Sequence, residues 1–439
     1  MVTGGAPRTT GVFYDDAYAR NMWKPGSDCT GPSGTETLYA ENLDKLVNGV
    51  IPLMNGVIDP ANLPMGMVGG KCVPVYPHSF MQTNTIFNVT REAGMYTAWS
   101  DKHPAYEIIN GPSGVGVNDL YTPEINNVND PTTISVAATD GYDQIKVKAI
   151  LNEIDGKRSD GSKSAPVPEI FGMNFQSVSV GEKLVDPALS CKRKDPPPST
   201  CDPNYVPGGY EPGTLKFTPQ MAQAMDYVDG AIGSMVHELE KKELLDSTEI
   251  IISAKHGQSP IDPAQVNKIG PAVDDVLKAA KIEIAQDTTD DVALVWLADQ
   301  KQTAAAVKAL LDDKAGPNHA KVDYVLSGDT LADRFGDPLK NARTPDLIVQ
   351  PKVGVIYTGS KAKVAEHGGF SENDTHVALL VVSPGGNRNA DGQDAENGGR
   401  TVATPVHTTQ IAPTILEFLG LKADALRSVR IEGTRALPR

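Results

Sequence analysis

Histidines and a lysine follow predicted strands at the points where those strands end. The apolar run Ile250–Ile252 is typical of a buried strand, and Lys255 and His256 follow it closely. His367, with two glycines after it, follows a second apolar segment. Glycine after a histidine lets the backbone pack closely beside an ion or a substrate. The two His-Gly pairs therefore predict that His256 and His367 share a metal or substrate site, whereas one such histidine alone is more often structural.

A further group of polar side chains follows the strand predicted over Met95–Trp99. Asp101, Lys102 and His103 lie there, and a solvated polar turn is an equally good interpretation of them. In an open α/β sheet, ligands bind in the crevice at the carboxyl ends of the strands. We therefore predict that Asp101 and Lys102 act in catalysis at the same edge of the sheet as the two histidines.

Lys255 is an unusual neighbour for a metal-binding histidine, because it carries a positive charge. Its ammonium group can neutralise a phosphate or sulfate oxygen in place of a metal ion, although it cannot acidify water as a metal does. The same charge would also suit a protein that binds anions without cleaving them. A third interpretation pairs Lys255 with a carboxylate such as Asp262. Its position after a strand end favours the first interpretation.

Apolar periodicity predicts alternating helices and strands after about the first 80 residues, which are rich in turn-forming types. The clearest helix begins at Thr218, a capping residue type, with proline at the first helical position. Further helices are predicted over 85–94, 142–156, 301–314 and 409–421, and further strands over 167–175, 290–299, 345–357 and 376–384. This alternation indicates an α/β fold with a doubly wound, mostly parallel sheet and helices on both faces.

Length and charge narrow the functional classes. The chain has 439 residues, a formal charge of -15 at pH 7 and 40% hydrophobic residues, enough for a substantial core. A nucleic-acid groove is not expected, because it needs clustered Lys and Arg. No run of about 18 apolar residues predicts a membrane-spanning helix. We expect one domain over residues 1–439, with a mobile surface loop over 384–400.

The four cysteines lie in irregular segments rich in glycine and proline. Cys191 and Cys201 bracket a proline-rich loop that a disulfide would close, which leaves Cys29 to pair with Cys72. An even number of loop cysteines favours an oxidising compartment, and the alternative is four free thiols in a cytosolic enzyme. No cysteine has the C-x-x-C spacing of a zinc site.

Longer stretches of the chain resemble the type I phosphodiesterase/nucleotide pyrophosphatase branch of the alkaline phosphatase superfamily. The most specific are AEHGGFSENDTHV and the final QIAPTILEFLGL. GGAPRTTGVFYDD, NVTREAGMYTAWSDKH and STEIIISAKHGQS match in the same order, so the resemblance covers nearly the whole chain. It implies an alkaline phosphatase-like fold, two metal ions, usually zinc, and a Ser or Thr nucleophile that attacks phosphorus.

The resemblance also assigns roles to individual positions. His256 and His367 match metal-binding histidines of the family, whereas Lys255 stands where the family has an aspartate. Glu169 matches the aspartate of the family's Pro-Asp-x-x-Gly-His segment, and Met173 replaces its histidine. The resemblance therefore implies a reduced site that holds one or two divalent ions, zinc being preferred, through His256, His367 and Glu169.

The family's first strand and its nucleophile would both lie upstream of Met1. We interpret this as a truncation at the N-terminus and expect the chain to be weakly active or inactive. The same loss would explain why no signal peptide precedes a chain with predicted disulfides. The alternative is that this branch never had the segment, but a doubly wound sheet without its first strand would expose apolar edges.

The sequence thus predicts a metal-dependent hydrolase of small-molecule phosphate esters in an extracellular or periplasmic compartment. Lys255, Asp101 and Lys102 are the predicted catalytic residues. Loops over 111–119 and 384–400 are expected to line the pocket. Sulfate-ester hydrolysis within the same superfamily is one alternative, although the usual sulfatase motif Cys-x-Pro-x-Arg does not occur in the chain. A non-catalytic anion-binding protein is the other.

Overall fold

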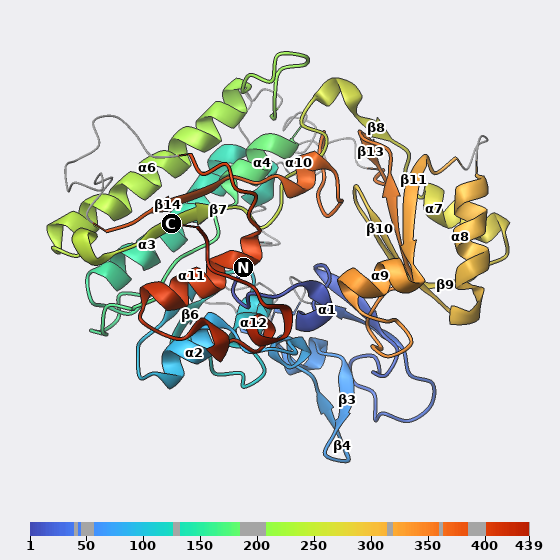
Figure 1. Ribbon diagram of the computed structural model, residues 1–439, viewed down its shortest axis with the longest axis horizontal. Coiled ribbons are helices and arrows are strands. Elements are labelled where there is room, and N and C mark those ends of the chain that lie inside the picture. The colour runs from blue at the N-terminus through green and yellow to red at the C-terminus, as the bar shows by residue number, and fades with distance from the viewer. Residues whose placement is uncertain are drawn as a thin grey trace, which may run out of the picture.

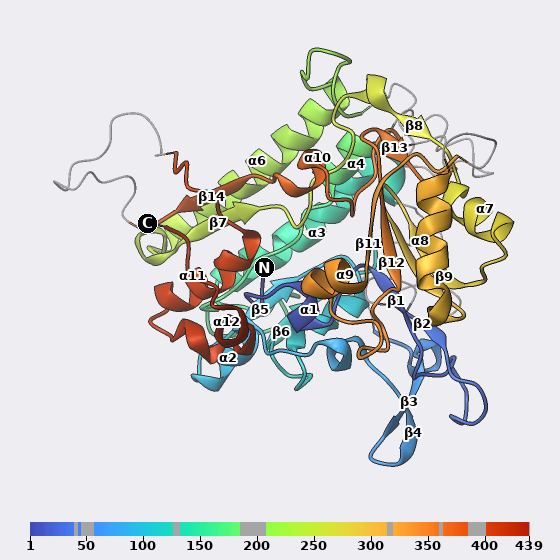
Figure 2. The same cartoon turned by 45° about the vertical axis from the view of Figure 1, so that its right-hand side comes forward.

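The computed structural model describes residues 1–38, 43–44, 57–125, 132–184, 208–313, 319–359, 363–384 and 401–438. The predicted mobile loop over 384–400 lies outside this part of the chain except for its first residue, as do Cys191 and Cys201. In both orientations, α3 (Val136–Ile154), α4 (Ser177–Lys183) and α6 (Pro219–Lys241) lie together on one side of the molecule, and a four-stranded sheet with its helices lies on the other (Figures 1 and 2).

The first 80 residues contain short elements where an irregular segment was predicted. They are α1 (Pro7–Thr10), β1 (Asp16–Ala19), β2 (Thr35–Leu38), β3 (Met65–Val68) and β4 (Lys71–Pro74). β1 pairs with β2 and β3 with β4, both antiparallel. Hairpin pairing defines these strands, so apolar periodicity did not reveal them. A disulfide joins Cys29 to Cys72, whose Cα atoms are 5.7 Å apart, which confirms that predicted pairing.

Three helices pack together next to the predicted site. They are α3 (Val136–Ile154), α4 (Ser177–Lys183) and α6 (Pro219–Lys241). The Thr218 hydroxyl accepts from Met221 N, so the predicted cap and proline start α6 as expected. Met221 and Leu239 of its apolar stripe are buried, whereas Met225 is exposed. The helix therefore buries only part of its apolar residues.

The four-stranded sheet has the strand order β11-β12-β10-β9 and is entirely antiparallel. Its strands are β9 (Ile284–Thr289), β10 (Ala293–Leu297), β11 (Val322–Ser327) and β12 (Leu347–Pro351). Side chains alternate between its two faces. On one face, Val295 and Leu347 pack against α7 (Ala272–Ala279) and α8 (Thr303–Asp312). On the other face, Trp296 and Ile348 belong to the core that also includes α9 (Gly328–Phe335), α11 (Ile411–Phe418) and α12 (Arg427–Glu432).

The strands nearest the predicted site form two small sheets. β5 (Ala98–Ser100) pairs in parallel with β6 (Asp119–Tyr121), and β7 (Ile250–Ser253) pairs antiparallel with β14 (Leu379–Val382). Parallel bridges also join Thr97 to Ile170 and Ser100 to Met173. The remaining elements are α2 (Ile86–Glu92), β8 (Asn267–Lys268), β13 (Val355–Ile356) and α10 (Glu372–Thr375).

The α/β class is confirmed, with helices and both parallel and antiparallel strands. Among the described residues, the strands are divided among one four-stranded sheet and five two-stranded sheets. The antiparallel order of the four-stranded sheet differs from the mostly parallel order that was predicted. β9 and β10 are joined by a turn of three residues, which imposes an antiparallel pair, whereas β11 and β12 are antiparallel although α9 lies between them.

Candidate functional site

The two predicted histidines lie side by side. His256 follows β7, His367 precedes α10, and their ring centroids are 4.1 Å apart. The Nδ1 atom of His256 lies 2.8 Å from the carbonyl oxygen of Gly257. Because a carbonyl oxygen only accepts, Nδ1 carries the proton and donates it to this bond. The Nε2 atom of the neutral His256 ring is therefore left as an acceptor.

Tyr14 fixes the other imidazole in the same way. Its hydroxyl lies within hydrogen-bond distance of Asp290 and 3.1 Å from Nδ1 of His367. A hydroxyl has one proton, and a carboxylate is the stronger acceptor, so Tyr14 donates to Asp290. His367 Nδ1–H then donates to the Tyr14 oxygen. His367 thus also presents an unprotonated Nε2.

Both histidines are neutral at pH 7. Desolvation and the charge of Lys255 lower the pKa of His256 to about 4. Desolvation and the charge of Lys183 lower the pKa of His367 well below its usual value. An imidazole that is neutral with a free Nε2 can accept a proton or bind a metal ion.

Three lysines surround this pair, and two of them were predicted. Lys255 donates from Nζ to the hydroxyl of Tyr106 at 2.9 Å. Lys102 follows β5, and desolvation together with the charge of Lys255 lowers its pKa to about 8. Lys183, the last residue of α4, lies 3.7 Å from Glu366. The charges of all three lysines contribute to the lowered pKa of His367.

Asp15 is a carboxylate on which the charges of all three lysines act. Desolvation opposes its ionisation, but Lys255, Lys102, His256 and Lys183 outweigh this effect and lower its pKa. Neither Asp15 nor Lys183 was predicted to be a site residue. Asp15 sits in the loop between α1 and β1, and Lys183 ends a short helix, so neither follows a predicted strand. A search for polar side chains directly after predicted strands therefore could not identify them.

Asp101 lies beside this region, and its carboxylate is already bound by three donors. Trp99 Nε1 donates to one oxygen at 3.0 Å. The backbone N–H of Lys102 and the side chain of Asn174 donate to the other at 2.8 and 3.2 Å. Asp101 is buried, so these bonds hold the backbone from which Lys102 projects. The structure thus gives Asp101 a positioning contact with the predicted catalytic lysine.

Glu169 lies at the opposite end of the parallel ladder from this site. It is exposed and accepts from the backbone N–H of Tyr96 at 2.9 Å, before the first bridge of the ladder. Met173 pairs with Ser100 at the carboxyl end, four residues further along. At about 3.3 Å per residue, Glu169 is roughly 13 Å away from that end. The structure therefore does not bring Glu169 to the histidines.

The donor set tests whether a divalent metal fits this site. His256 and His367 offer two nitrogens, but no group of three or more His, Cys, Asp or Glu able to hold a metal ion exists among the described residues. A structural or catalytic zinc site needs three or four protein ligands. Lys102, Lys183 and Lys255 would also repel a cation here. The described residues therefore do not fit the predicted zinc site.

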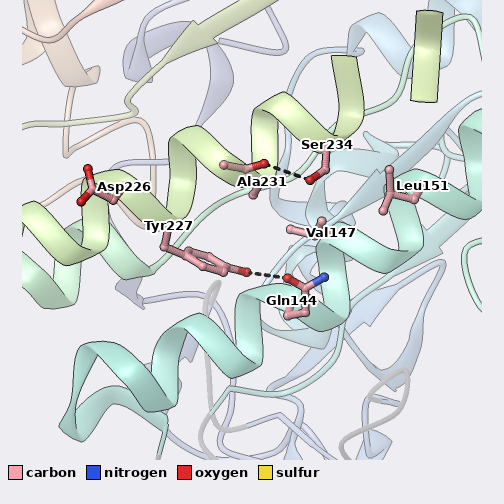
Figure 3. A pocket seen from close by; sticks show the side chains of 8 residues that line it. Gln144, Val147, Leu151, Asp226, Tyr227, Ala231 and Ser234 are labelled. Atoms are coloured by element: carbon pink, nitrogen blue, oxygen red, sulfur yellow. Dashed lines mark hydrogen bonds between the residues drawn. The ribbon is translucent and has the colours of Figure 1, made fainter. Parts of the chain in front are cut away.

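A separate hollow of about 290 Å³ lies between α3 and α6 (Figure 3). It is lined by Gln144, Val147, Leu151, Asp226, Tyr227, Gly230, Ala231 and Ser234. The Tyr227 hydroxyl lies 3.4 Å from the side-chain oxygen of Gln144 inside it. The lining includes none of the predicted site residues and no cationic side chain, so we place the candidate site at the lysine–histidine region instead.

Within the described part of the chain, no helix is both long and apolar enough to cross a membrane.

Comparisons with known proteins support the fold and the class of protein. The model of the family "type I phosphodiesterase / nucleotide pyrophosphatase" matches residues 208–377, a range that includes Lys255, His256 and His367. The solved structure of murine ectonucleotide pyrophosphatase/phosphodiesterase 5 is similar with a TM-score of 0.53 at 13% identity, covering 96% of this chain and 82% of that one. The wild-type alkaline phosphatase PafA gives a TM-score of 0.55 at 12% identity, with 96% and 85% covered.

These findings confirm the resemblance that the sequence motifs indicated. The fold is that of the alkaline phosphatase superfamily. Residues 208–377 resemble the type I phosphodiesterase/nucleotide pyrophosphatase family, which supports the predicted class, hydrolases of phosphate esters. No match was found among curated proteins.

Proposed function

We propose that this chain binds a small-molecule phosphate ester at the lysine–histidine site and hydrolyses it. The observation that carries the proposal is the adjacent pair of neutral imidazoles that each present a free Nε2, with the charges of Lys102, Lys183 and Lys255 acting on His367. Cationic groups aimed at phosphoryl oxygens stabilise the charge that spreads over them in the transition state.

The site residues suit the proton transfers of ester hydrolysis. A new bond forms between phosphorus and the attacking oxygen, and His256 or His367 accepts the proton of that oxygen at Nε2. The bond from phosphorus to the ester oxygen breaks, and that oxygen needs a proton. Lys102 can donate it, since its pKa of about 8 lies close to neutral pH. Asp101 positions Lys102, because its carboxylate accepts a hydrogen bond from the backbone N–H of Lys102.

A structural neighbour supports the substrate class. An inactive variant of murine ectonucleotide pyrophosphatase/phosphodiesterase 5 was solved in complex with AMP and has a TM-score of 0.51 with this chain. AMP is a small phosphate monoester, and the proposal extends this class of ligand to the present chain. A sulfate ester is the second candidate, because ammonium groups recognise a tetrahedral oxyanion by charge and do not distinguish sulfur from phosphorus.

Two finer predictions from the sequence remain proposals. The zinc ion would have to bind through His256 and His367, and any third ligand must come from outside the described set of His, Cys, Asp and Glu residues. The predicted extracellular or periplasmic location is supported by the Cys29–Cys72 disulfide, because such bonds persist in oxidising compartments.

Hydrolysis of three chromogenic esters tests the proposed function. We would compare 4-nitrophenyl phosphate, bis(4-nitrophenyl) phosphate and 4-nitrophenyl sulfate, each with the wild-type chain and with Lys255→Met. Turnover of one phosphate ester that falls at least about a hundredfold in Lys255→Met supports the proposal. Lys340→Met is the matched control, since Lys340 is 83% exposed and pairs with Asp337. Equal rates in all three proteins would refute it, and turnover of the sulfate alone would favour the second candidate.

A further inference from the structure

The short helix α10 connects the loops that carry the two histidines of the site. Asp374 lies in this helix, a few residues after His367. Its carbonyl oxygen accepts from the backbone N–H of Gly257, the residue after His256, at 2.7 Å. A Cβ atom on Gly257 would overlap the carbonyl oxygen of Asn373, so only glycine allows this close approach. The backbone beside His256 therefore packs directly on α10.

The side chain of Asp374 lies against the other loop. A Cβ atom on Gly369 would lie 2.9 Å from Oδ2 of Asp374 and 3.2 Å from Oδ1 of Asp291, so both carboxyl groups lie close to this glycine. Oδ1 of Asp291 accepts from the backbone N–H of Gly369 at 2.8 Å. Oδ2 of Asp374 accepts from the hydroxyl of Ser371 at 2.6 Å. The second glycine after His367 thus makes room for two neighbouring carboxyl groups.

These two carboxyl groups need a proton between them. Asp291 and Asp374 are each 3% exposed. Oδ2 of Asp291 and Oδ1 of Asp374 have no donor among the described residues. Two carboxylates in a desolvated site repel each other, so the pair keeps one proton, which forms a hydrogen bond between them. Burial, this hydrogen bond and the negative charges of Asp374 and Asp290 accordingly raise the pKa of Asp291.

The turn that carries Asp291, between β9 and β10, holds the His367 loop at a second point. Asp290 precedes Asp291 in this turn and accepts from Tyr14, whose hydroxyl lies 3.1 Å from Nδ1 of His367. A Cβ atom on Gly368 would overlap the Tyr14 ring, and Gly368 has a φ of +102°. Each of the two glycines after His367 therefore faces a side chain that this turn holds in place.

We propose that Asp291 and Asp374 form a hydrogen-bonded carboxyl pair that positions His256 and His367 relative to each other. The inference rests on the proposed function, because the two imidazoles are the groups assigned there to proton transfer. Asp374 links the two loops, since its carbonyl oxygen binds one and its side chain lies against the other. Asp291 supports this arrangement from the β9–β10 turn. Both act through the backbone of the loops, so they are positioning residues rather than catalytic ones.

NMR spectra of the full chain, with its eight histidines isotope-labelled at the ring nitrogens, test this inference. In Asp291→Asn the amide can donate to Asp374 and accept from Gly369, so the spectra of His256 and His367 should match those of the wild type. In Asp291→Leu both bonds are lost. The Nδ1 and Nε2 signals of His367 should then approach each other by at least about a quarter of their separation, because the ring is no longer held in one tautomer.

Hydrolysis of the three chromogenic esters gives a second measurement. For the ester that the wild-type chain hydrolyses, Asp291→Leu should lower kcat at least about tenfold and leave KM within about twofold, because displaced imidazoles impair proton transfer rather than binding. Asp291→Asn should keep kcat within about threefold of the wild type. The matched control is Asp274→Leu, which disrupts the hydrogen-bonded carboxyl groups of Asp274 on α7 and Asp287 on β9 and should change neither measurement.

Gly369→Ala separates the role of the pair from a general loss of folding. Its Cβ would press on Asp374 without removing a carboxyl group, so it should change the His367 spectrum even if Asp291→Leu does not fold. Spectra of Gly369→Ala and of folded Asp291→Leu that match Asp274→Leu would overturn the inference. A loss of kcat in Asp291→Asn as large as in Asp291→Leu would overturn it too. The expected spectra in a chain that hydrolyses none of the esters would support the pair and refute the proposed function.

Discussion

Replacing Lys146 by methionine should strongly destabilise the fold, because it breaks a fully buried ion pair. Lys146 and Asp143 lie on α3 with 0% exposure of both side chains, and Nζ is 3.0 Å from Oδ1. Asp143 also accepts from the backbone N–H groups of Gln176 and Ser177 at 2.7 and 2.9 Å. The Lys146 ammonium donates to the carbonyl oxygen of Asn174. The pair thus anchors the segment that leads into α4.

The expected magnitude follows from what each substitution leaves behind. Removing one partner of a buried ion pair costs about 3–5 kcal/mol of unfolding free energy, because the other charge remains uncompensated. In Lys146→Met, Asp143 keeps its donors, among them the Ser177 hydroxyl at 2.8 Å, so the loss should lie near 3 kcal/mol. In Asp143→Asn, Lys146 keeps the Asn174 carbonyl and the face of Tyr142, 4.8 Å away, and the loss should be about 4 kcal/mol.

Urea denaturation followed by circular dichroism measures these losses. The double variant Asp143→Asn/Lys146→Met should cost at least about 2 kcal/mol less than the sum of the single variants, because the two charges are coupled. Lys308→Met is the control, since its ion pair with Asp312 is solvent-exposed and should contribute little. A loss below about 1 kcal/mol in Lys146→Met, or strict additivity in the double variant, would refute the reasoning.

Three further predictions concern pH and the disulfide. The charge of sulfate is constant near neutral pH, so its binding should weaken about tenfold from pH 7 to pH 9 as Lys102 loses its proton near pH 8. An unchanged pH profile in Lys102→Met would contradict a role of Lys102 in binding the anion. The pKa of His256 is about 4 in the folded chain against 6.5 for the free residue, so the unfolded state binds the proton first. Stability present above pH 6.5 is lost as the pH falls toward 4, by up to about 3 kcal/mol, and thermal melts of His256→Asn should show a flatter dependence. Replacing Cys29 and Cys72 by alanine removes a disulfide between residues separated by 43 positions. The unfolding free energy should fall by up to about 4 kcal/mol in urea titrations, and no change would show that the disulfide does not constrain the unfolded chain.

Local sequence signals predicted many of the secondary-structure elements and the histidines of the site. Thr218 and Pro219 marked the start of α6, because capping and a fixed φ act within one turn. The run Ile250–Ile252 predicted β7, and the residues after it include His256. The family motifs then brought His256 and His367 together, and their rings are indeed neighbours. Signals of this kind depend on a few consecutive residues, so a single sequence reveals them.

Long-range packing decided the features that no local signal contained. Asp15 and Lys183 reach the site from a loop and from the end of a short helix, far apart in the chain. Glu169 and Met173 differ by only four positions, yet strand direction places Glu169 at the end away from the histidines. The antiparallel order of the four-stranded sheet likewise depends on how strands pair, which side-chain periodicity does not encode.

Lys255 illustrates both parts of this division. Its type and its place before His256 were enough to predict a positive charge next to a ligand-binding residue, because charge is a property of the side chain itself. Its role depends on its neighbours, namely the hydroxyl of Tyr106 and the charges of Asp15 and Lys102. Those neighbours come from three separate segments, and only the tertiary structure brings them close enough for the hydrogen bond to Tyr106 and for the interaction of the charges.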